Sequence, residues 1–267
     1  ISDTTTIDQI YCGKYISGNI TLTTGLKMPN STDDCDYHGI IVNASNIGID
    51  CDSYSITGTG SGYGISVNSF NGLTVVGCNI TGFDRGVSLQ SSDSATVTNS
   101  TISSNSYGLY IRSSIGGLFY YNTFIGNSLH VSTDVSGNSF NTTLAGKPVG
   151  NDWDDAATLA IFDSDSDGYA DFGQQDPYKK ANGGRISANV IDWGPRSSQL
   201  DSDNDGSSDT EDCAPSNPAV MAPRNGLFIT RNSTLCSGTY SLNNTLYSGI
   251  IRFNSSGLSL RCNSTKL

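Results

Sequence analysis

A 22-residue period separates three segments of matching pattern in the first half of the chain: Gly64-Ile65-Ser66-Val67, Gly86-Val87-Ser88-Leu89 and Gly108-Leu109-Tyr110-Ile111. The same spacing relates two further series, Leu73, Ala95, Gly117 and Ile80, Ile102, Phe124. Each period therefore holds three short apolar stretches separated by Asn, Ser and Gly, which is typical of one coil of a three-sided parallel β-helix. The sequence predicts an all-β fold in which each coil buries its inward side chains by stacking on its neighbours.

The pattern divides the chain into four parts. We expect an N-terminal cap with the first strands, the coils, an acidic connector, and an incomplete second β-helix, in that order: 1–38, 39–147, 148–222 and 223–267. The last part repeats features of the first, because Cys236 echoes Cys12 and the segment 254–262 echoes 43–51. A partial β-helix leaves strand edges open, so we expect further chain or another subunit to complete it.

The net charge of −11 is concentrated in one region. Between Asp152 and Asp212 the sequence holds 15 acidic and 4 basic residues, whereas the rest of the chain holds 10 of each. Local acidity of this kind favours cation binding. No basic stripe is present to neutralise phosphates, so a nucleic-acid partner is not expected. No apolar run is long enough to cross a bilayer, so no membrane span is expected.

The acidic region contains the pattern D-x-D-x-D-G-x-x-D twice, at 163–171 and 201–209. Alternating carboxylates can converge on one hard cation, the Gly permits a sharp turn, and the following carbonyl can add a ligand. A flexible cage with many carboxylates favours calcium over magnesium. The predicted calcium ligands are Asp163, Asp165, Asp167, Tyr169, Asp171, Asp176, Asp201, Asp203, Asp205, Ser207, Asp209 and Asp212.

These motifs carry a family resemblance over roughly residues 39–215. The coils, followed by the segment 150–155 and the first acidic motif, resemble the NosD-type β-helix repeat family, which implies a right-handed parallel β-helix and is common in archaeal surface proteins. The second motif, with its ending Asp209-Thr-Glu-Asp212-Cys213-Ala-Pro215, resembles a thrombospondin type 3 calcium repeat. Copper delivery, which NosD itself implies, is not expected here, since the chain has two His and two Met residues. We expect both His38 and His130 at the surface or at a corner.

Seven cysteines without a Cys-x-x-Cys pair favour disulfides in an oxidising compartment over a zinc site. From the echo between the two ends of the chain we predict Cys12–Cys51 and Cys236–Cys262, with Cys35–Cys78 between coils and Cys213 left over. Ten Asn-x-Ser/Thr sequons predict N-linked glycans at Asn19, Asn30, Asn43, Asn79, Asn99, Asn141, Asn232, Asn243, Asn254 and Asn263.

The sequence as a whole favours a secreted structural glycoprotein of a cell surface or an extracellular filament. We expect it to be stiffened by calcium and to assemble head to tail with other copies, with no catalytic residues. One alternative is a carbohydrate-binding β-helix or polysaccharide lyase, and another is an adhesin. The enzyme alternative would use Asp84, Arg85, Asp93 and Arg112, with Asp84 and Arg112 close together. Aromatic residues at 107, 110, 119, 120, 121 and 124 could bind sugars, but strand alternation should turn about half of them into the core.

Overall fold

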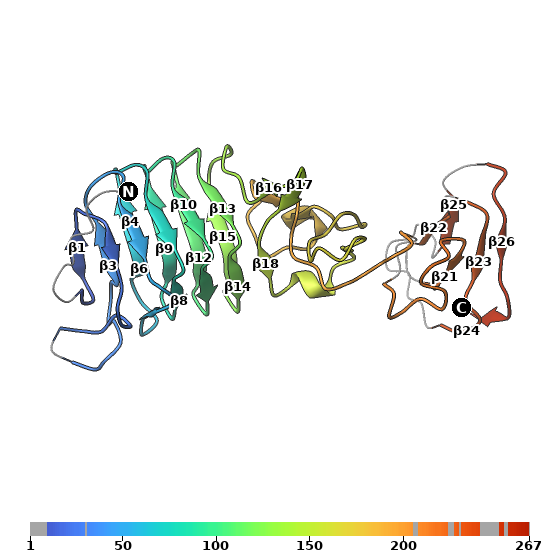
Figure 1. Ribbon diagram of the computed structural model, residues 1–267, viewed down its shortest axis with the longest axis horizontal. Coiled ribbons are helices and arrows are strands. Elements are labelled where there is room, and N and C mark those ends of the chain that lie inside the picture. Colours follow the sequence, from blue (N-terminus) through green and yellow to red (C-terminus); the bar gives the residue numbers. More distant parts are fainter. Residues whose placement is uncertain are drawn as a thin grey trace. The chain divides into compact units, whose positions relative to one another are not determined.

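The computed structural model of the chain describes residues 10–29, 31–204, 208–223, 227–229, 231–240, 251–253 and 256–266. It forms two compact units. In Figure 1 the first is coloured mostly from blue to yellow and the second mostly from orange to red. The first unit comprises Ile1–Ile161 and Gln174–Arg196, and the second comprises Phe162–Gly173 and Ser197–Leu267. The acidic segment is therefore shared between the two units, whereas the sequence predicted one connector.

Three parallel sheets wind through the first unit, as the 22-residue period predicts. The first sheet has the order β1-β3-β6-β9-β12-β15, and its strands lie side by side from blue to green in Figure 1. These strands are β1 (Lys14–Ile16), β3 (Ile40–Val42), β6 (Tyr63–Asn68), β9 (Arg85–Gln90), β12 (Tyr107–Arg112) and β15 (Leu129–Thr133). Each strand pairs in parallel with the strand one coil away, so the predicted parallel β-helix is confirmed.

The other two sheets have the orders β13-β10-β7-β4-β2 and β18-β14-β11-β8-β5. The second sheet contains β2 (Ile20–Thr21), β4 (Gly48–Asp50), β7 (Thr74–Val76), β10 (Thr96–Thr98) and β13 (Leu118–Tyr120). The third contains β5 (Ser55–Thr57), β8 (Asn79–Thr81), β11 (Thr101–Ser103), β14 (Thr123–Ile125) and β18 (Asp152–Trp153). Strands of three residues suffice, because each sheet is one side of a narrow coil and alternate side chains point inward.

The core consists of columns in which equivalent residues stack from coil to coil. One column contains Ile56, Ile80, Ile102, Phe124 and Trp153, each 1% exposed or less. Burying one such side chain stabilises the fold by about 1.5–3 kcal/mol. Glycine begins strand segments where the next coil approaches closely: a Cβ at Gly86 would lie 2.7 Å from the carbonyl oxygen of Gly108. The repeated Gly of the sequence is therefore a steric requirement of the stack.

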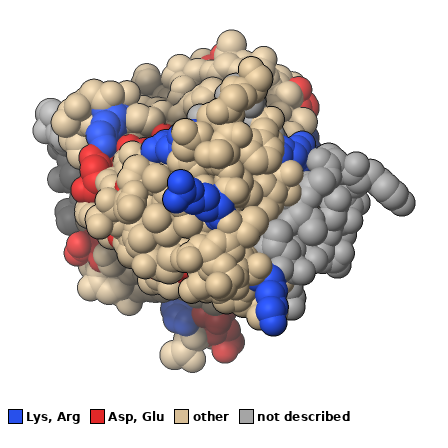
Figure 2. All heavy atoms as spheres, turned by 90° about the vertical axis from the view of Figure 1, so that its right-hand side faces the viewer, with Lys and Arg blue, Asp and Glu red and all other residues tan. Residues whose placement is uncertain are grey.

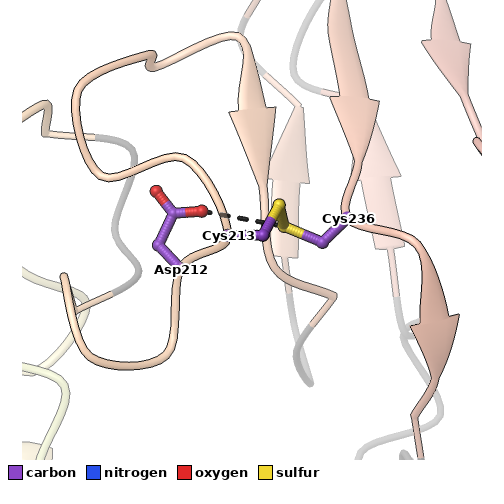
Figure 3. A group of neighbouring side chains, drawn as sticks. All are labelled: Asp212, Cys213 and Cys236. Carbon is purple, nitrogen blue, oxygen red and sulfur yellow. Dashed lines mark hydrogen bonds between the residues drawn. A yellow bond between two sulfur atoms is a disulfide. The ribbon is translucent and has the colours of Figure 1, made fainter.

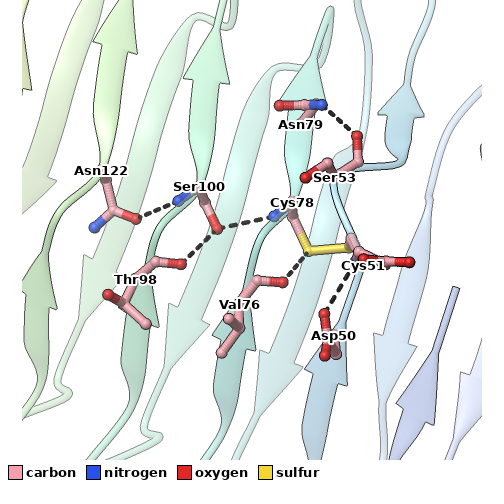
Figure 4. Close-up of a disulfide and its surroundings, with 10 residues drawn as sticks. Asp50, Cys51, Ser53, Val76, Cys78, Asn79, Thr98, Ser100 and Asn122 are labelled. Atoms are coloured by element: carbon pink, nitrogen blue, oxygen red, sulfur yellow. Dashed lines mark hydrogen bonds between the residues drawn. A yellow bond between two sulfur atoms is a disulfide. The ribbon is translucent and has the colours of Figure 1, made fainter.

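A ladder of side chains at one corner links successive coils (Figure 4). Ser100 Oγ accepts the backbone N–H of Cys78 at 3.1 Å, and Asn122 Oδ1 accepts that of Ser100 at 3.1 Å. Asn151 continues the ladder by accepting the N–H of Asn122 at 3.1 Å. In the preceding coils the same corner holds the Cys51–Cys78 disulfide. Such inward polar groups are stable because each is hydrogen-bonded.

The disulfide predictions are wrong in their partners. The structure pairs Cys12 with Cys35, Cys51 with Cys78, and Cys213 with Cys236, and it leaves Cys262 free and exposed. The bonded residues are 23, 27 and 23 positions apart, about one coil each. Cysteines on adjacent coils lie side by side, within the Cα separation that a disulfide requires. The predicted pairing compared the two ends of the chain and overlooked this neighbour relation.

The last coil of the first unit is covered by a non-repeating segment. It contains the hairpin β16 (Thr142–Leu144) and β17 (Lys147–Val149), the pair β19 (Tyr178–Lys179) and β20 (Ile191–Asp192), and two 3-10 turns, η1 (Ala156–Thr158) and η2 (Lys180–Asn182). Trp153 stacks on Phe124 at 4.5 Å between ring centroids, and Tyr178 stacks on Trp153 at 4.6 Å. Aromatic side chains thus close the apolar columns.

The corner ladder also ends in this covering segment, at the fully buried Asp192. Asp192 Oδ2 accepts the N–H of Asn151 at 2.8 Å and Nε1–H of Trp153 at 2.9 Å. Burial raises the pKa of this carboxyl group to about 7, although the hydrogen bonds from Asn151, Gly194 and Trp153 oppose the shift.

The second unit contains a short second set of parallel strands. They are β21 (Val220–Met221), β22 (Leu227–Ile229), β23 (Ser233–Leu235), β24 (Gly238–Thr239), β25 (Ile251–Phe253), β26 (Leu260–Arg261) and β27 (Thr265–Lys266). They form three sheets, β21-β23-β26, β22-β25 and β24-β27, around a small core of Met221, Leu227, Ile229 and Leu235. This arrangement is the start of a second β-helix.

The second unit repeats the geometry of the first two coils. Asn19 Oδ1 accepts the N–H of Gly48 at 2.7 Å, and Asn232 Oδ1 accepts that of Ser259 at 2.9 Å. The register between β23 and β26 matches that between β2 and β4. Cys262, which follows β26, is therefore equivalent to Cys51, which follows β4. This part of the sequence echo is correct, whereas Cys236 does not take the place of Cys12.

Candidate metal centre

The first acidic motif forms a closed loop in the second unit. Phe162 and Phe172 pair in antiparallel fashion and bring the two ends of the loop together. Asp163 is 5% exposed, and its carboxylate accepts the backbone N–H groups of Asp165, Ser166 and Gly168 at 2.8 to 3.1 Å. These contacts turn the chain sharply around one buried carboxylate. Gly168 has φ +88°, the left-handed conformation that its lack of a Cβ permits.

Three carboxylates of this loop converge. Asp163, Asp165 and Asp171 each offer one oxygen, and these three oxygens lie within 4.8 Å of one another. Asp171 is positioned by Ser164, which donates its backbone N–H at 3.0 Å and its hydroxyl at 2.5 Å to Asp171 Oδ2. Several carboxylate oxygens that converge in this way suit a calcium ion.

The second acidic motif lies beside the first and repeats its geometry. The backbone N–H of Asp163 donates to the carbonyl of Gln199 at 2.9 Å, and the backbone carbonyl of Asp163 accepts the N–H of Asp201 at 3.0 Å. Asp201 is fully buried, and Ser202 donates its N–H and hydroxyl to Asp209 as Ser164 does to Asp171. Ser166 and Asn204, at equivalent positions, have φ of 65° and 59°. The two motifs are therefore structural copies over the residues that can be compared.

Asp212 joins the second motif to a disulfide. Its Oδ1 accepts the N–H of Ala214 at 3.1 Å, and its Oδ2 is buried without a hydrogen-bond partner in the described chain. Burial raises the pKa of Asp212, and the negative charges of Asp203 and Asp209 raise it further. These carboxylates are therefore close enough to repel one another, and a cation among them would relieve the repulsion.

The disulfide beside Asp212 is not a metal site itself. Asp212, Cys213 and Cys236 lie together, and the sulfur of Cys236 is 3.7 Å from Asp212 Oδ1 (Figure 3). Both sulfurs are consumed in the Cys213–Cys236 bond, so neither is the thiolate that metal binding requires. The bond instead ties the end of the acidic motif to the residue that follows β23.

The remaining predicted ligands fall into three groups. Asp167 and Tyr169 lie within the first loop, where Asp167 Oδ1 accepts the N–H of Tyr169 at 2.9 Å. Asp176 belongs to the first unit, within its covering segment. Asp205 and Ser207 lie outside the described residues.

A second titratable cluster, which the sequence analysis missed, covers the last coil of the first unit. His130 is fully buried, so the prediction of a surface or corner position is wrong for it. Its Nδ1 lies 3.3 Å from Asn127 Nδ2, and its Nε2 lies 2.9 Å from Asp154 Oδ1 and 3.1 Å from a terminal nitrogen of Arg185. His130 follows Gly64, Gly86 and Gly108 at the same spacing, and this change from Gly to His was the available sequence signal. A side chain fits because another kind of segment covers this coil.

Two aspartates and an arginine complete this cluster. Arg185 contacts the Asp154 carboxylate, and its Nε is 3.5 Å from Asp155 Oδ2. Burial raises the pKa of Asp155, but hydrogen bonds from His130, Tyr178 and the backbone of Arg185 outweigh it and lower the pKa to about 2. His130, Asp154 and Asp155 offer converging donor atoms. The guanidinium already supplies the positive charge there, so the cluster fits an internal ion-pair network better than a metal site.

His38 and the candidate enzyme residues are separate from both clusters. His38 Nδ1 accepts the N–H of Tyr63 at 3.2 Å at a corner, as predicted, and burial lowers its pKa. Asp84 lies 3.4 Å from Arg85 Nε, and among the described residues no ion pair joins it to Arg112. Asp93 Oδ1 accepts the N–H of Ile115 at 2.9 Å and so serves a corner.

The basic residues on one face of the molecule do not form a continuous patch. Lys and Arg occur as separate spots on the face shown in Figure 2. In the described part of the chain, no helix is long and apolar enough to cross a membrane.

The sequons differ in what their side chains already bind. Asn43, Asn99 and Asn263 are exposed. Asn19 and Asn232 accept a backbone hydrogen bond through Oδ1, which leaves Nδ2 for a glycan. Asn79 uses Nδ2 to donate to the carbonyl of Ser53 at 2.6 Å, and Asn141 Nδ2 donates to the carbonyl of Thr142 at 3.3 Å. Asn30, Asn243 and Asn254 lie outside the described residues.

Comparison with known proteins gives one family. The profile of the family described as "Periplasmic copper-binding protein (NosD)" matches residues 28–157. No curated protein and no solved structure matches the chain. The copper named in that description does not suit these residues, because His130 is held in an ion-pair network and His38 binds the backbone. The match spans β3 to β18, most of the coil stack, and agrees with the parallel β-helix described above, so this part of the chain is a NosD-like parallel β-helix.

Proposed function

We propose that this chain is a secreted structural glycoprotein of a cell surface or extracellular filament, stabilised by calcium. The observation that carries the proposal is the pair of equivalent acidic loops. Asp163 and Asp201 are buried carboxylates in adjacent loops of the same geometry, and each loop positions a further carboxylate through a serine. Carboxylates that lie close together repel one another, and a bound cation removes that repulsion.

Calcium would order the second unit through the Cys213–Cys236 disulfide. The acidic motif that ends at Asp212 is followed at once by Cys213, and Cys236 directly follows β23. A motif fixed by an ion would therefore hold the first coil of the short β-helix through a covalent bond. Ligands that bind the folded state stabilise it by mass action. The role of the ion in this proposal is mechanical rather than catalytic.

Stacking of coils supports the proposed head-to-tail assembly. The second unit carries the strand pattern of the first two coils of the first unit, and unpaired strand edges can pair with other strands. A contact between two different surfaces of identical chains produces a filament when it does not close into a ring. N-linked glycans at exposed corners such as Asn43 and Asn99 would face away from the core.

Calcium titration tests the metal part of the proposal. We expect the wild-type chain to bind calcium in calorimetry and to unfold at a lower temperature in chelator. Asp163→Asn and Asp201→Asn should each weaken binding at least tenfold, since each removes a charged ligand. Asp36→Asn, which changes an exposed carboxylate outside the acidic region, is the matched control. Equal calcium affinity of all four proteins would contradict the proposal.

Electron microscopy tests assembly separately. Purified native material should form regular filaments that fray in chelator. Dispersed particles with and without calcium, at high protein concentration, would exclude self-assembly while leaving the calcium sites intact.

A further inference from the structure

Two arginines and a tyrosine form a stack on the outer face of the first sheet. The guanidinium carbon of Arg85 lies 3.7 Å from the ring centroid of Tyr110, and that of Arg112 lies 4.0 Å from the same centroid. Tyr63 continues the stack, with its centroid 4.8 Å from Arg85. These side chains come from β6, β9 and β12, which are neighbours in the sheet, and all are partly exposed.

The parallel register creates this stack. Tyr63, Arg85 and Tyr107 are direct neighbours across three strands, whereas Tyr110 and Arg112 lie further along β12 on the same outward face. Phe119 and Phe124 are fully buried, as alternation predicts, and so do not belong to this surface. Stacked guanidinium groups keep their N–H bonds in their own plane, so the stacking contact itself uses none of these donors.

The positive charge of the stack is incompletely balanced. Arg85 has Asp84 nearby, at 3.4 Å from its Nε, but that Nε is buried without a hydrogen bond. Arg112 donates to the carbonyl of Ile111 at 2.9 Å and to Ser132 Oγ at 3.0 Å. Among the described residues no carboxylate lies within 4 Å of Arg112, and the terminal nitrogens of Arg85 donate no hydrogen bond. Two guanidinium groups therefore share one carboxylate.

We propose that the stack formed by Arg85, Tyr110 and Arg112 binds the carboxylate groups of an acidic polysaccharide. Arginine pairs with carboxylates through two parallel hydrogen bonds, which suits a fixed, stacked guanidinium. Tyr107 lies beside the stack, 5.4 Å from Tyr110, and no guanidinium stacks on its ring among the described residues, so it can pack against a sugar ring. Two cations are too few for a nucleic acid, whose affinity depends on many phosphate contacts. They suit a polymer that presents one carboxylate per sugar and needs few ion pairs.

The site differs from the calcium loops and is independent of the proposed structural function. It lies in the first unit, outside the acidic region. Binding here would anchor the β-helix to an acidic matrix through its side.

The test is a titration of the full chain with polygalacturonate, with calcium chelated so that ion bridges cannot contribute. Arg112→Ala should weaken the affinity about tenfold or more, the usual effect of losing a charge-assisted hydrogen bond pair. Arg112→Lys, which keeps the charge but loses the paired donors, should give an intermediate loss. Lys180→Ala removes an equal charge from an exposed turn of the same unit and should change affinity less than twofold.

Three outcomes would overturn the proposal. They are unchanged affinity in Arg112→Ala, equally strong binding of a neutral polysaccharide, and equally strong binding of duplex DNA. If Arg112→Ala fails to fold, Arg112→Lys and Arg85→Lys retain the positive charge without the paired guanidinium donors, and so still distinguish specific pairing from bulk charge. A sulfated polysaccharide of similar charge density shows whether the site prefers carboxylate or accepts any oxyanion.

Discussion

Replacement of Asn122 by Ala should remove the centre of the corner ladder. Asn122 is 1% exposed, accepts the N–H of Ser100 at 3.1 Å, and donates to the carbonyl of Val97 at 2.8 Å and to Asn151 Oδ1 at 3.1 Å. Alanine would leave the first two groups without this partner and deprive Asn151 of one donor. Each buried group left unsatisfied costs about 1–3 kcal/mol, so we expect a loss of about 3–5 kcal/mol in the free energy of unfolding.

Asn122→Ser is the informative companion variant, because the preceding coil has Ser at this position. Ser100 accepts the N–H of Cys78 through Oγ and donates to the carbonyl of Thr98 at 3.0 Å. A serine at 122 can make the two equivalent bonds one coil further on, so Asn122→Ser should lower the free energy of unfolding by about 1–2 kcal/mol. Asn68→Ala, at an exposed position in the same stack, should cost less than about 0.5 kcal/mol.

Denaturation in guanidinium chloride, followed by tryptophan fluorescence, measures these differences. Both tryptophans belong to the first unit, and Trp153 is 1% exposed. If Asn122→Ala were no less stable than Asn122→Ser, the corner ladder would not contribute as argued. A loss in Asn68→Ala equal to that in Asn122→Ala would show that the assay reports general sensitivity of the stack.

Three further predictions concern titration and thiol chemistry. The folded-state pKa of Asp155 is lowered to about 2, so its ionised carboxylate should stabilise the folded state by about 2 kcal/mol above pH 4. This stabilisation should be lost as the pH falls toward 2, and acid denaturation of Asp155→Asn should lack this component. Because burial raises the pKa of Asp192 to about 7, the folded state binds an extra proton between pH 4 and pH 7, so stability should fall as pH rises through that range; the fall should be absent in Asp192→Asn melts. The native chain should react with one equivalent of a thiol reagent, at Cys262, and peptide mapping that found a second modified cysteine would contradict the three disulfides.

The fold was predictable because the β-helix is a one-dimensional structure. Each coil packs against the next copy of the same sequence repeat, so the spacing between Gly64, Gly86 and Gly108 predicts directly which strands pair. The inward columns follow from strand alternation. The acidic loops were likewise visible, since their carboxylates lie within a few residues of one another. The repeat also predicted that the tail begins a second β-helix.

Tertiary structure decided what the repeat does not contain. The partners of Cys51 and Cys12 depend on coil lengths of 27 and 23 residues, which place each cysteine beside its neighbour one coil on rather than beside its sequence echo. His130 and Asp192 acquire their surroundings from the segments 148–161 and 174–196, which have no repeat and meet the last coil through contacts distant in sequence. The sequence by itself determined how the chain stacks, since local patterns govern that. The covering of the last coil, the disulfide partners and the surroundings of the buried titratable groups were decided by the three-dimensional arrangement, because these contacts join residues that share no sequence pattern.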